Sequence, residues 1–314
     1  MDNVISSYAL EVDGVSKYYG KLRAVNNISF NVRYGEAVGF VGLNGAGKTT
    51  TLKMILGLIK LSGGRITIDG HPASQSQSLN NVSVLTEQPQ FYSGFSGRKN
   101  LKILLKKGSK KFTERSLSEE LEKVDLQDAA DRPVSSYSKG MRTRLGIAHA
   151  LARNSRIFVF DEPATGLDPV GISFIRDLIR SLADAGAAVL FSSHILSEVE
   201  TVCDRVVMVH RGNLVAFDTL ENVNKLTSRS QVLQVGVEEA EMATAIQLLS
   251  KRFPDVREEK GKLVLAATSG KEVNQALQEG GIVLSELAVR EHGLDAVFRE
   301  MVEAPQADDD NPDG

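Results

Sequence analysis

The stretch Gly42-Leu43-Asn44-Gly45-Ala46-Gly47-Lys48-Thr49 decides how this sequence folds. It fits the pattern G-x-x-x-x-G-K-[ST] in full, between an apolar run at 38–41 and a helical pattern at 50–59. Glycines let the backbone curl so that its N–H groups point at phosphate oxygens, and the helix dipole adds positive potential there. The Lys48 ammonium suits the β- and γ-phosphates, and the Thr49 hydroxyl suits Mg²⁺. We therefore predict a nucleotide triphosphate site, in which we include the adjoining Thr50.

A second pattern places two acids at the end of an apolar strand. Residues 157–160 read Ile-Phe-Val-Phe, and Asp161 and Glu162 follow directly. Two carboxylates at a strand end are costly unless they have a task, and adjacent strand residues point to opposite faces. We expect Asp161 to hold the Mg²⁺ shell and Glu162 to polarise the attacking water as a general base. The alternative is an exposed strand end that is closed by Pro163.

Short apolar runs alternate with helical patterns over residues 8–222, which predicts an α/β fold with a largely parallel sheet. Residues 95–130 break this alternation with helices rich in Lys, Glu and Leu, inside a helical subdomain at about 90–150. Seven of the fourteen residues at 98–111 are basic. They form either a solvated helix face or a surface near anionic lipids or a partner. The predicted strands are 38–41, 157–160 and 187–191, and the predicted helices are 50–59, 139–152 and 171–183.

The pattern changes after residue 227, so we divide the chain into a nucleotide-binding domain at 8–226 and a small α+β domain at 227–303. The second domain reads strand, helix, strand, strand, helix, strand, which suggests a ferredoxin-like fold. A short helix at 294–302 follows, and the acidic tail at 304–314 is expected to be disordered. The elements expected in this domain lie at 231–237, 239–252, 256–267, 271–278 and 282–287.

Composition excludes several classes of protein. The chain has 314 residues, 42% of them hydrophobic and 25% charged, which fits about two globular domains. The formal net charge of -3 argues against nucleic acid as a partner, and a single cysteine, Cys203, excludes a disulfide scaffold. No apolar run approaches the roughly 18 residues of a membrane-spanning helix. Residues 1–8 lack the features of a signal peptide, so a cytoplasmic location is expected.

The stretch Tyr137-Ser138-Lys139-Gly140-Met141 lies just before the helical run at 142–152, and Ser138 is a residue type that caps helices. Alone, it indicates no more than a helix cap. Together with four other motifs in order, however, it resembles the nucleotide-binding subunits of ABC transporters over about residues 9–220. The other four are the phosphate loop, Asp161-Glu162-Pro163, Gly166-Leu167-Asp168-Pro169 and Ser192-Ser193-His194.

The resemblance implies a P-loop NTPase fold, the cofactors ATP and Mg²⁺, and a site that two chains share. In this family, Ser138 and the Gly140 N–H would stabilise the γ-phosphate bound by the partner chain, and Asp168 would lie at the dimer interface. His194 would contact the γ-phosphate and help to position the water. Tyr19 matches the aromatic residue that stacks on adenine, with the adjacent Tyr18 as the alternative.

One position departs from the family pattern in a way that affects the metal site. The family usually has Gln in the mobile loop that senses the membrane subunit, and the alignment places Glu87 there with Gln88 next to it. A carboxylate keeps an acceptor oxygen for Mg²⁺ and loses the amide donor. We therefore assign Glu87 to the metal shell, while a shift of one residue would place Gln88 there instead. The stretch at 137–141, which matches the signature motif of the family, also has Lys139 where Gly is usual. This lysine would add a positive charge near the phosphate bound by the partner chain.

The function that the resemblance implies is that of an ATP-hydrolysing motor subunit of an exporter. It would work as a homodimer on the inner face of the cytoplasmic membrane, with a membrane permease on a separate chain that docks near Glu87 and the helices of 95–130. The segment Leu294-Asp295-Ala296-Val297-Phe298 is similar to the end of many exporter ATPases. The alternatives are a soluble ABC ATPase without transport, a module that holds ATP without turnover, and the ATPase of a copper- or sulfur-handling maturation transporter. The transported substrate is chosen in the permease.

Overall fold

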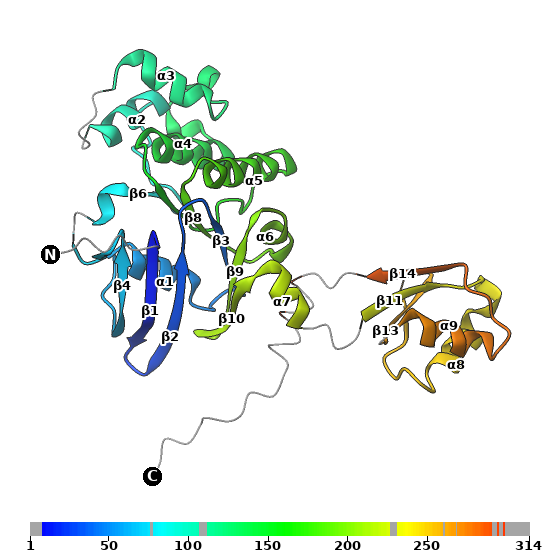
Figure 1. Cartoon of the computed structure of the whole chain (residues 1–314). Coiled ribbons are helices and arrows are strands. Elements are labelled where there is room, and N and C mark those ends of the chain that lie inside the picture. The colour runs from blue at the N-terminus through cyan, green and yellow to red at the C-terminus, as the bar shows by residue number, and fades with distance from the viewer. Residues whose placement is uncertain are drawn as a thin grey trace, which may run out of the picture. The chain divides into compact units, whose positions relative to one another are not determined.

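The computed structural model of the chain describes residues 8–75, 78–106, 112–226, 231–259, 261–267 and 269–290, together with Leu294 and Phe298. It divides into two compact units, Met1–Leu220 and Glu221–Gly314 (Figure 1). The predicted domain boundary lay after residue 226, at the end of the short helix α7 (Leu220–Leu226), so the two divisions lie at opposite ends of one helix. The predicted acidic tail, and all of the predicted last helix except Leu294 and Phe298, fall outside the described residues.

The first unit is built on a ten-stranded sheet in the order β5-β4-β1-β2-β10-β9-β3-β8-β7-β6. Five neighbouring strands, β9, β3, β8, β7 and β6, are parallel, as the alternation of strands and helices predicts. Their bounds are Arg205–His210, Ala37–Val41, Ala188–Ser193, Ile157–Phe160 and Val82–Leu85. All the residues of β3, β7 and β8 are buried, which explains the apolar runs at 38–41, 157–160 and 187–191.

The other half of the sheet is mainly antiparallel. β1 pairs antiparallel with β2 and β4, while β10 pairs antiparallel with β9 and joins β2 through Asn213 and Asn26. Burial alternates along β1, because only one face of this half packs on the core. The bounds of these strands are Leu10–Tyr19 (β1), Leu22–Val32 (β2), Gly63–Ile68 (β4), His71–Pro72 (β5) and Asn213–Thr219 (β10).

Three helices of this unit pack near the sheet, and two of their limits have an identifiable cause. α1 (Lys48–Ile55) ends four residues earlier than predicted, because Gly57 takes a left-handed conformation with φ 65°. α5 (Pro169–Asp184) starts at its cap Asp168, and α6 (Leu196–Val202) follows β8. In the core, Leu52, Met54 and Ile55 of α1 join the apolar residues of both halves of the sheet.

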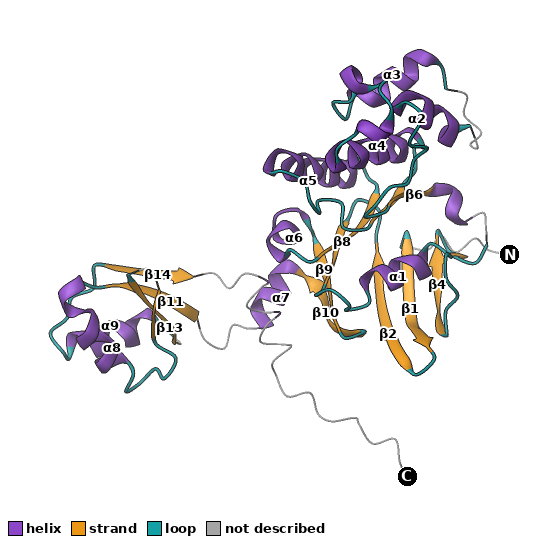
Figure 2. Cartoon of the chain, turned by 180° about the vertical axis from the view of Figure 1, so that it is seen from behind, coloured by secondary structure: helices purple, strands orange, loops and turns teal. Residues whose placement is uncertain are grey.

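The helices α2 (Gly97–Leu105), α3 (Glu114–Glu122) and α4 (Lys139–Ala152) pack together, as Figure 2 shows. α4 also contacts β6, where Ser83 Oγ donates to Ala150 O at 2.7 Å. Leu101, Leu117 and Leu145, one from each helix, are fully buried. Arg98 pairs with Asp131 at 2.9 Å and Lys102 pairs with Glu114, so part of the basic stretch is neutralised by nearby acids. Short 3-10 turns at Ser78–Asn81, Gln127–Ala129 and Val134–Ser136 complete the unit.

The second unit is a four-stranded antiparallel sheet in the order β12-β13-β11-β14, with two helices. Leu233 and Leu263 of the sheet and Leu249 and Leu277 of the helices share one buried core. The elements follow in the predicted order, and the ferredoxin-like assignment stays a prediction. The bounds are β11 Gln231–Gly236, a 3-10 turn Glu239–Glu241, α8 Met242–Leu249, β12 Arg257–Glu259, β13 Lys262–Ala267, α9 Gly270–Gln278 and β14 Glu286–Arg290.

One strand of this unit starts later than predicted. β14 begins at Glu286, whereas the sequence indicated a strand at 282–287. Ile282 is buried in the core shared with the helices, so the segment before β14 links α9 to the sheet. Backbone pairing begins only where Ser285 N–H donates to Gly236 O at 2.9 Å.

Candidate nucleotide-binding and catalytic site

The carboxyl ends of four parallel strands bring the predicted motifs to one edge of the sheet. The phosphate loop follows β3, the segment with Glu87 follows β6, Asp161 and Glu162 follow β7, and His194 follows β8. Ligands of open α/β sheets bind at this edge, where the loops between strands and helices converge. The topology therefore explains why residues that lie more than a hundred positions apart form one site.

Two glycines of the phosphate loop are required by space alone. A Cβ on Gly42 would lie 2.4 Å from Val209 O, and a Cβ on Gly47 would lie 2.7 Å from Ala24 O. Gly47 also caps α1 with φ 101°, a conformation that favours glycine. A Cβ on Gly45, in contrast, would meet nothing within 4 Å, so its backbone faces open space. The loop is anchored at Gly42 and Gly47 and exposes backbone between them.

Lys48 is buried inside this loop and touches the catalytic candidate Glu162. Its Nζ donates to Gly42 O at 2.6 Å and lies 3.2 Å from Oε1 of Glu162, with 6% of the side chain exposed. A buried ammonium needs such partners, because desolvation of an unpaired charge is costly. Lys48 therefore links the phosphate loop to the end of β7.

Glu162 is held by contacts from three segments. Its backbone is left-handed, with φ 51°, and its N–H donates to Ser192 Oγ at 2.9 Å. Its Oε2 accepts the Thr165 hydroxyl at 3.0 Å and lies 2.7 Å from His194 Nδ1. Burial raises the pKa of Glu162, but the His194 hydrogen bond and the Lys48 charge outweigh it and leave the pKa below its usual value. The carboxylate is therefore ionised at neutral pH.

Asp161 points its carboxylate at two hydroxyls. Its Oδ1 accepts from Ser192 Oγ at 2.7 Å and from Thr49 Oγ1 at 3.3 Å. Carboxylate and hydroxyl oxygens are the hard ligands that Mg²⁺ takes, so Thr49 and Asp161 fit this ion. Among the residues that the structure describes, no group of three or more His, Cys, Asp and Glu could hold a metal.

Ser192 is a site residue that sequence reasoning noted only as part of the Ser-Ser-His motif. It contacts both acids, donating to Asp161 and accepting from the Glu162 N–H. Its position follows from register, because Phe160 of β7 pairs with Phe191 of β8, which places Ser192 beside Asp161. The sequence predicted both strands but not that they are neighbours, and this pairing is the signal that would have found Ser192.

A cavity of about 550 Å³ collects most of the predicted site residues. Glu162, His194 and Glu87 line it, whereas Gln88 does not. Tyr19 also lines it and exposes 49% of its surface, while Tyr18 is not among the lining residues. The phosphate-loop residues that line the cavity are Leu43, Asn44, Gly45, Ala46, Gly47, Lys48 and Thr49, together with Thr50.

Five predicted residues do not line this cavity. Gly42 and Asp161 bond to Lys48 and Thr49, which do line it, so they belong to the same site. Ser138, Gly140 and Asp168 lie elsewhere in the unit. Ser138 caps α4 by accepting from Met141 N–H at 3.2 Å, and Asp168 caps α5 by accepting from Gly171 N–H at 2.8 Å. Both side chains belong to exposed residues at helix N-termini, and Gly140 lies in the first turn of α4. Within one chain, the structure does not bring Ser138, Gly140 and Asp168 to the phosphate loop.

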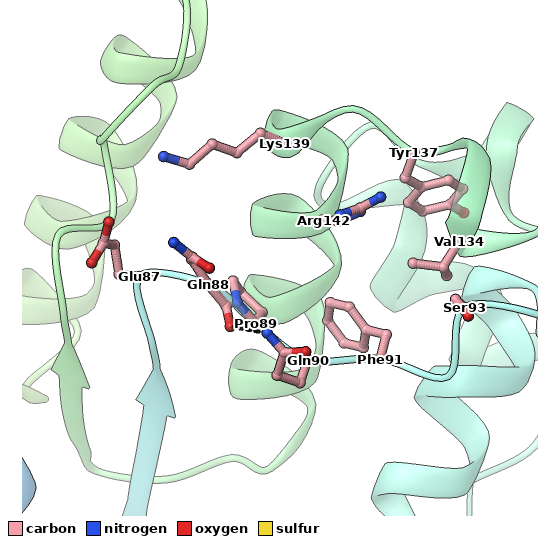
Figure 3. Close-up of a pocket in the computed structure, with 10 residues that line it drawn as sticks. All are labelled: Glu87, Gln88, Pro89, Gln90, Phe91, Ser93, Val134, Tyr137, Lys139 and Arg142. Carbon is pink, nitrogen blue, oxygen red and sulfur yellow. Dashed lines mark hydrogen bonds between the residues drawn. The ribbon is translucent and has the colours of Figure 1, made fainter.

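The segment after β6 lies between the phosphate-loop cavity and the helices. A second cavity of about 470 Å³ runs along Glu87, Gln88 and Phe91 and reaches Lys139 and Arg142 of α4 (Figure 3). Gln90 Nε2 donates to Gln88 O at 3.2 Å within this segment. Glu87 thus lines both cavities, and the segment connects the nucleotide site to the helical part of the unit.

Comparison with known proteins decides the family. The chain matches the ABC transporter family over residues 25–165. It is 34% identical over 309 residues to the bacitracin transport ATP-binding protein BcrA of Bacillus licheniformis, covering 94% of this chain and 98% of that one. The chain belongs to the ATP-binding subunits of ABC transporters. The ABC transporter assignment that the motifs predicted is therefore confirmed.

Solved structures agree with this assignment. An ATP-binding subunit of an ABC transporter matches with a TM-score of 0.65 and 29% identity, over 70% of this chain and 93% of that one. A dimeric ATP-binding cassette in a post-hydrolysis state, bound to ADP and Pi, matches in fold with a TM-score of 0.62 and 23% identity, over 67% and 98%. This ABC subunit has the P-loop NTPase fold and is an ATPase, the motor of a transporter. None of the helices that the structure describes is long and apolar enough to cross a membrane.

Proposed function

We propose that this ABC subunit works as a homodimer that hydrolyses two ATP molecules and drives export through a permease on a separate chain. BcrA, which is named for bacitracin transport, aligns with almost the whole of this chain, including the second unit. One structural neighbour is a dimer. Ser138 and Asp168 lie outside the phosphate-loop cavity, which supports a site that a second chain completes.

Catalysis is assigned to Glu162, and one observation carries this assignment. Its carboxylate is only 11% exposed and is gripped by Lys48 at 3.2 Å and His194 at 2.7 Å, inside the cavity of the phosphate loop. Glu162 accepts a proton from the attacking water, and His194 fixes the carboxylate and contacts the γ-phosphate. Lys48 is shared between Glu162 and the phosphates. When ATP draws Lys48 away, one cause of the lowered pKa is lost and Glu162 becomes a stronger base.

Thr49, Asp161 and Glu87 are assigned to the metal. Mg²⁺ at this position neutralises charge on the phosphates of ATP. Thr49 and Asp161 face each other at 3.3 Å, and Glu87 lines the cavity in which both Thr49 and Glu162 lie. The Ser192 hydroxyl orients Asp161, as the 2.7 Å hydrogen bond indicates. These residues, at the ends of β3, β6 and β7, would hold the ion.

The nucleotide is bound from two chains in this proposal. Tyr19, half exposed at the cavity, stacks on adenine, while the backbone of residues 42–49 and Thr50 surround the phosphates. Ser138 and Gly140 of the partner copy close over the γ-phosphate, since the start of α4 offers N–H groups and a hydroxyl to an anion. Asp168 lies at the same dimer interface.

The permease is proposed to dock near Glu87 and the helices α2 and α3. The cavity of Figure 3 lies beside Glu87 and carries both polar and aromatic groups, among them Gln88, Phe91 and Arg142. The segment from Glu87 to Phe91 therefore joins a docking surface to the metal site. Such docking would hold the subunit on the inner face of the cytoplasmic membrane.

The test is Glu162→Gln, which keeps the size of the side chain and removes the base. ATP hydrolysis should fall by about a hundredfold or more, which is within the usual contribution of a general base. ATP binding should remain, and the variant should form an ATP-dependent dimer in light scattering. Asp184→Asn, a change at an exposed carboxylate of α5, serves as the control. If Glu162→Gln turns over ATP at the wild-type rate, Glu162 is not the base.

A further inference from the structure

A cavity of about 300 Å³ lies between α5 and α6, on residues that the proposed function leaves unused. Ile175 and Ile179 of α5, Phe191 of β8 and Val202 of α6 line it, and all four side chains are at most 4% exposed. Ser197 and Thr201 also line the cavity and are exposed, which marks its opening along α6. An apolar floor with a polar opening, at the small end of the usual volume range, is typical of a site for a compact ligand.

Glu198 supplies the polar group of this cavity. It lines the cavity, and its Oε1 is buried without a hydrogen-bond partner among the described residues. Its Oε2 accepts the Ser193 hydroxyl at 3.0 Å. A buried acceptor without a donor is costly. Burial accordingly raises the pKa of Glu198, against the Ser193 hydrogen bond that lowers it.

The other charged residue of the cavity does not neutralise Glu198. Arg176 lines the cavity from α5, and its Nη2 donates to Ser173 Oγ at 3.2 Å on the same helix. Glu198 forms no ion pair within 4.0 Å with any of the basic residues that the structure describes. A ligand that brings one donor would therefore satisfy an oxygen that the folded chain leaves unpaired.

The walls of the cavity are continuous with the catalytic loops. Pro163 and Ala164, which line it, directly follow Glu162 in the chain. On the other side, Ser193 bonds to Glu198 and accepts the Ile195 N–H at 2.9 Å, so it holds the backbone on both sides of His194. Two hydrogen bonds therefore connect Glu198 to the loop that bears His194, one between Glu198 and Ser193 and one between Ser193 and Ile195.

We propose that this cavity binds a compact apolar molecule with one hydrogen-bond donor, an ammonium or a hydroxyl group, that meets Glu198, and that its occupancy shifts the His194 loop through Ser193. The proposal that a ligand binds depends on the cavity alone. The proposal that binding affects hydrolysis through the His194 loop rests on the proposed function of His194. The apolar floor receives the body of the ligand, and Glu198 selects against anions.

Binding is tested by titrating the full chain with benzylamine, benzyl alcohol and benzoate, followed by ligand-observed NMR. At least one of the two donor ligands should bind saturably, and benzoate at least tenfold more weakly. A preference for benzylamine identifies an organic cation site, and equal binding of benzyl alcohol identifies a neutral donor. Thr201→Trp, at an exposed position of the opening, should weaken binding at least tenfold. Absence of saturable binding, or binding that Thr201→Trp leaves unchanged, overturns the site.

Two further variants separate charge from shape. Glu198→Gln should weaken benzylamine at least tenfold, and benzyl alcohol less, because the side-chain shape is kept while the charge is lost. Glu200→Gln, on the same helix and outside the cavity, should leave both affinities unchanged. An equal effect of these two variants overturns the role of Glu198.

Transmission has its own readout, which does not depend on turnover. The imidazole signals of His194, assigned by comparison with His194→Gln, should shift as benzylamine saturates the protein and should not shift in Thr201→Trp. Saturable binding without this shift overturns the transmission and leaves the site. The rate of Glu162→Gln bears on the proposed function alone, so failure of one proposal is distinguishable from failure of the other.

Discussion

Nδ1 of His194 lies 2.7 Å from Oε2 of Glu162, and this contact helps to lower the pKa of the carboxylate that we propose as the general base. Burial alone would raise the pKa of Glu162, and the hydrogen bond to His194 is the largest of the effects that lower it again. The contact joins the end of β7 to the end of β8, two adjacent parallel strands. Glu162 and His194 therefore come from neighbouring positions of one sheet edge.

The first prediction concerns pH. His194→Ala should raise the pKa of Glu162, because burial is then opposed by fewer contacts. The acidic limb of the pH–rate profile of ATP hydrolysis should move to higher pH, so the loss of rate relative to the wild type should be largest at low pH and should shrink as the pH rises. A ¹³C NMR titration of the Glu162 carboxylate checks the same shift without turnover.

The control for this pH prediction is His71→Ala, at an exposed position of β5.

In the wild-type protein, the lowered pKa means that the ionised Glu162 stabilises the fold above the ordinary glutamate pKa. That stabilisation is lost as the pH falls through the folded-state pKa. A pKa of Glu162 that is the same in the wild type and in His194→Ala contradicts the assigned role of the contact.

The second prediction separates Glu87 from Gln88. Glu87 lines the cavity of the phosphate loop and Gln88 does not, so Glu87→Ala should raise the Mg²⁺ concentration for half-maximal ATPase activity by about tenfold or more. Gln88→Ala is the matched neighbour and should leave that concentration nearly unchanged. The measurement is a Mg²⁺ titration at saturating ATP. A larger effect of Gln88→Ala would move the metal ligand by one residue.

Much of the nucleotide-binding half could be predicted from the sequence, because its local and global signals agree. The helix over 139–152 and the strand over 157–160 appear with the predicted bounds. Ser138 is a strong N-cap, and the strand is buried on both faces, so each pattern has one interpretation. The need for glycine in the phosphate loop could also be predicted, and in the structure a Cβ on Gly42 or Gly47 would collide with a backbone oxygen.

What the sequence could not show depends on register and on packing across the sheet. The antiparallel strands β1 and β2 carry bulges, and their half-buried pattern is weaker than a continuous apolar run. The contact between Lys48 and Glu162, 114 positions apart (162 − 48), needs the order of β3, β8 and β7. The unpaired oxygen of Glu198 has no sequence signal, because a missing hydrogen-bond donor can be recognised only from the folded structure.

The third prediction tests the shared site by mixing two inactive subunits. Ser138→Arg should block the partner's γ-phosphate site, and Lys48→Ala should disable the phosphate loop of its own chain. A mixed dimer holds one intact site, built from the phosphate loop of the first variant and the α4 terminus of the second. An equal mixture should thus regain about a quarter of the wild-type ATPase rate, because half of the dimers are mixed and each has one of two sites.

Circular dichroism serves as the folding control for these variants, since the loss of the Ser138 cap costs about 1 kcal/mol. Recovery should depend on mixing and should disappear when both substitutions are placed in one chain that is mixed with itself. If the mixture hydrolyses ATP no faster than its components, Ser138 does not act on the partner's nucleotide.

The last prediction concerns the packing that supports both catalytic loops. Gly39 lies in the middle of β3, and a Cβ there would approach Val199 Cγ1 to 2.4 Å and Cys203 Sγ to 2.9 Å. Gly39→Ala should therefore lower the free energy of unfolding by about 1–3 kcal/mol through overpacking, measured by urea denaturation. Gly94→Ala is the matched control, because a Cβ there meets nothing within 4 Å and should change stability little.

Val199 lies on α6, the helix that follows His194, and Gly39 lies on the strand that leads into the phosphate loop. If the clash is the cause, Val199→Ala should be less harmful in the Gly39→Ala background than alone, with a coupling energy of about 1 kcal/mol in a double-mutant cycle. Additive effects of the two changes would show that β3 and α6 are not coupled at this contact. The close approach of α6 to β3 would then not be the reason for a glycine at position 39.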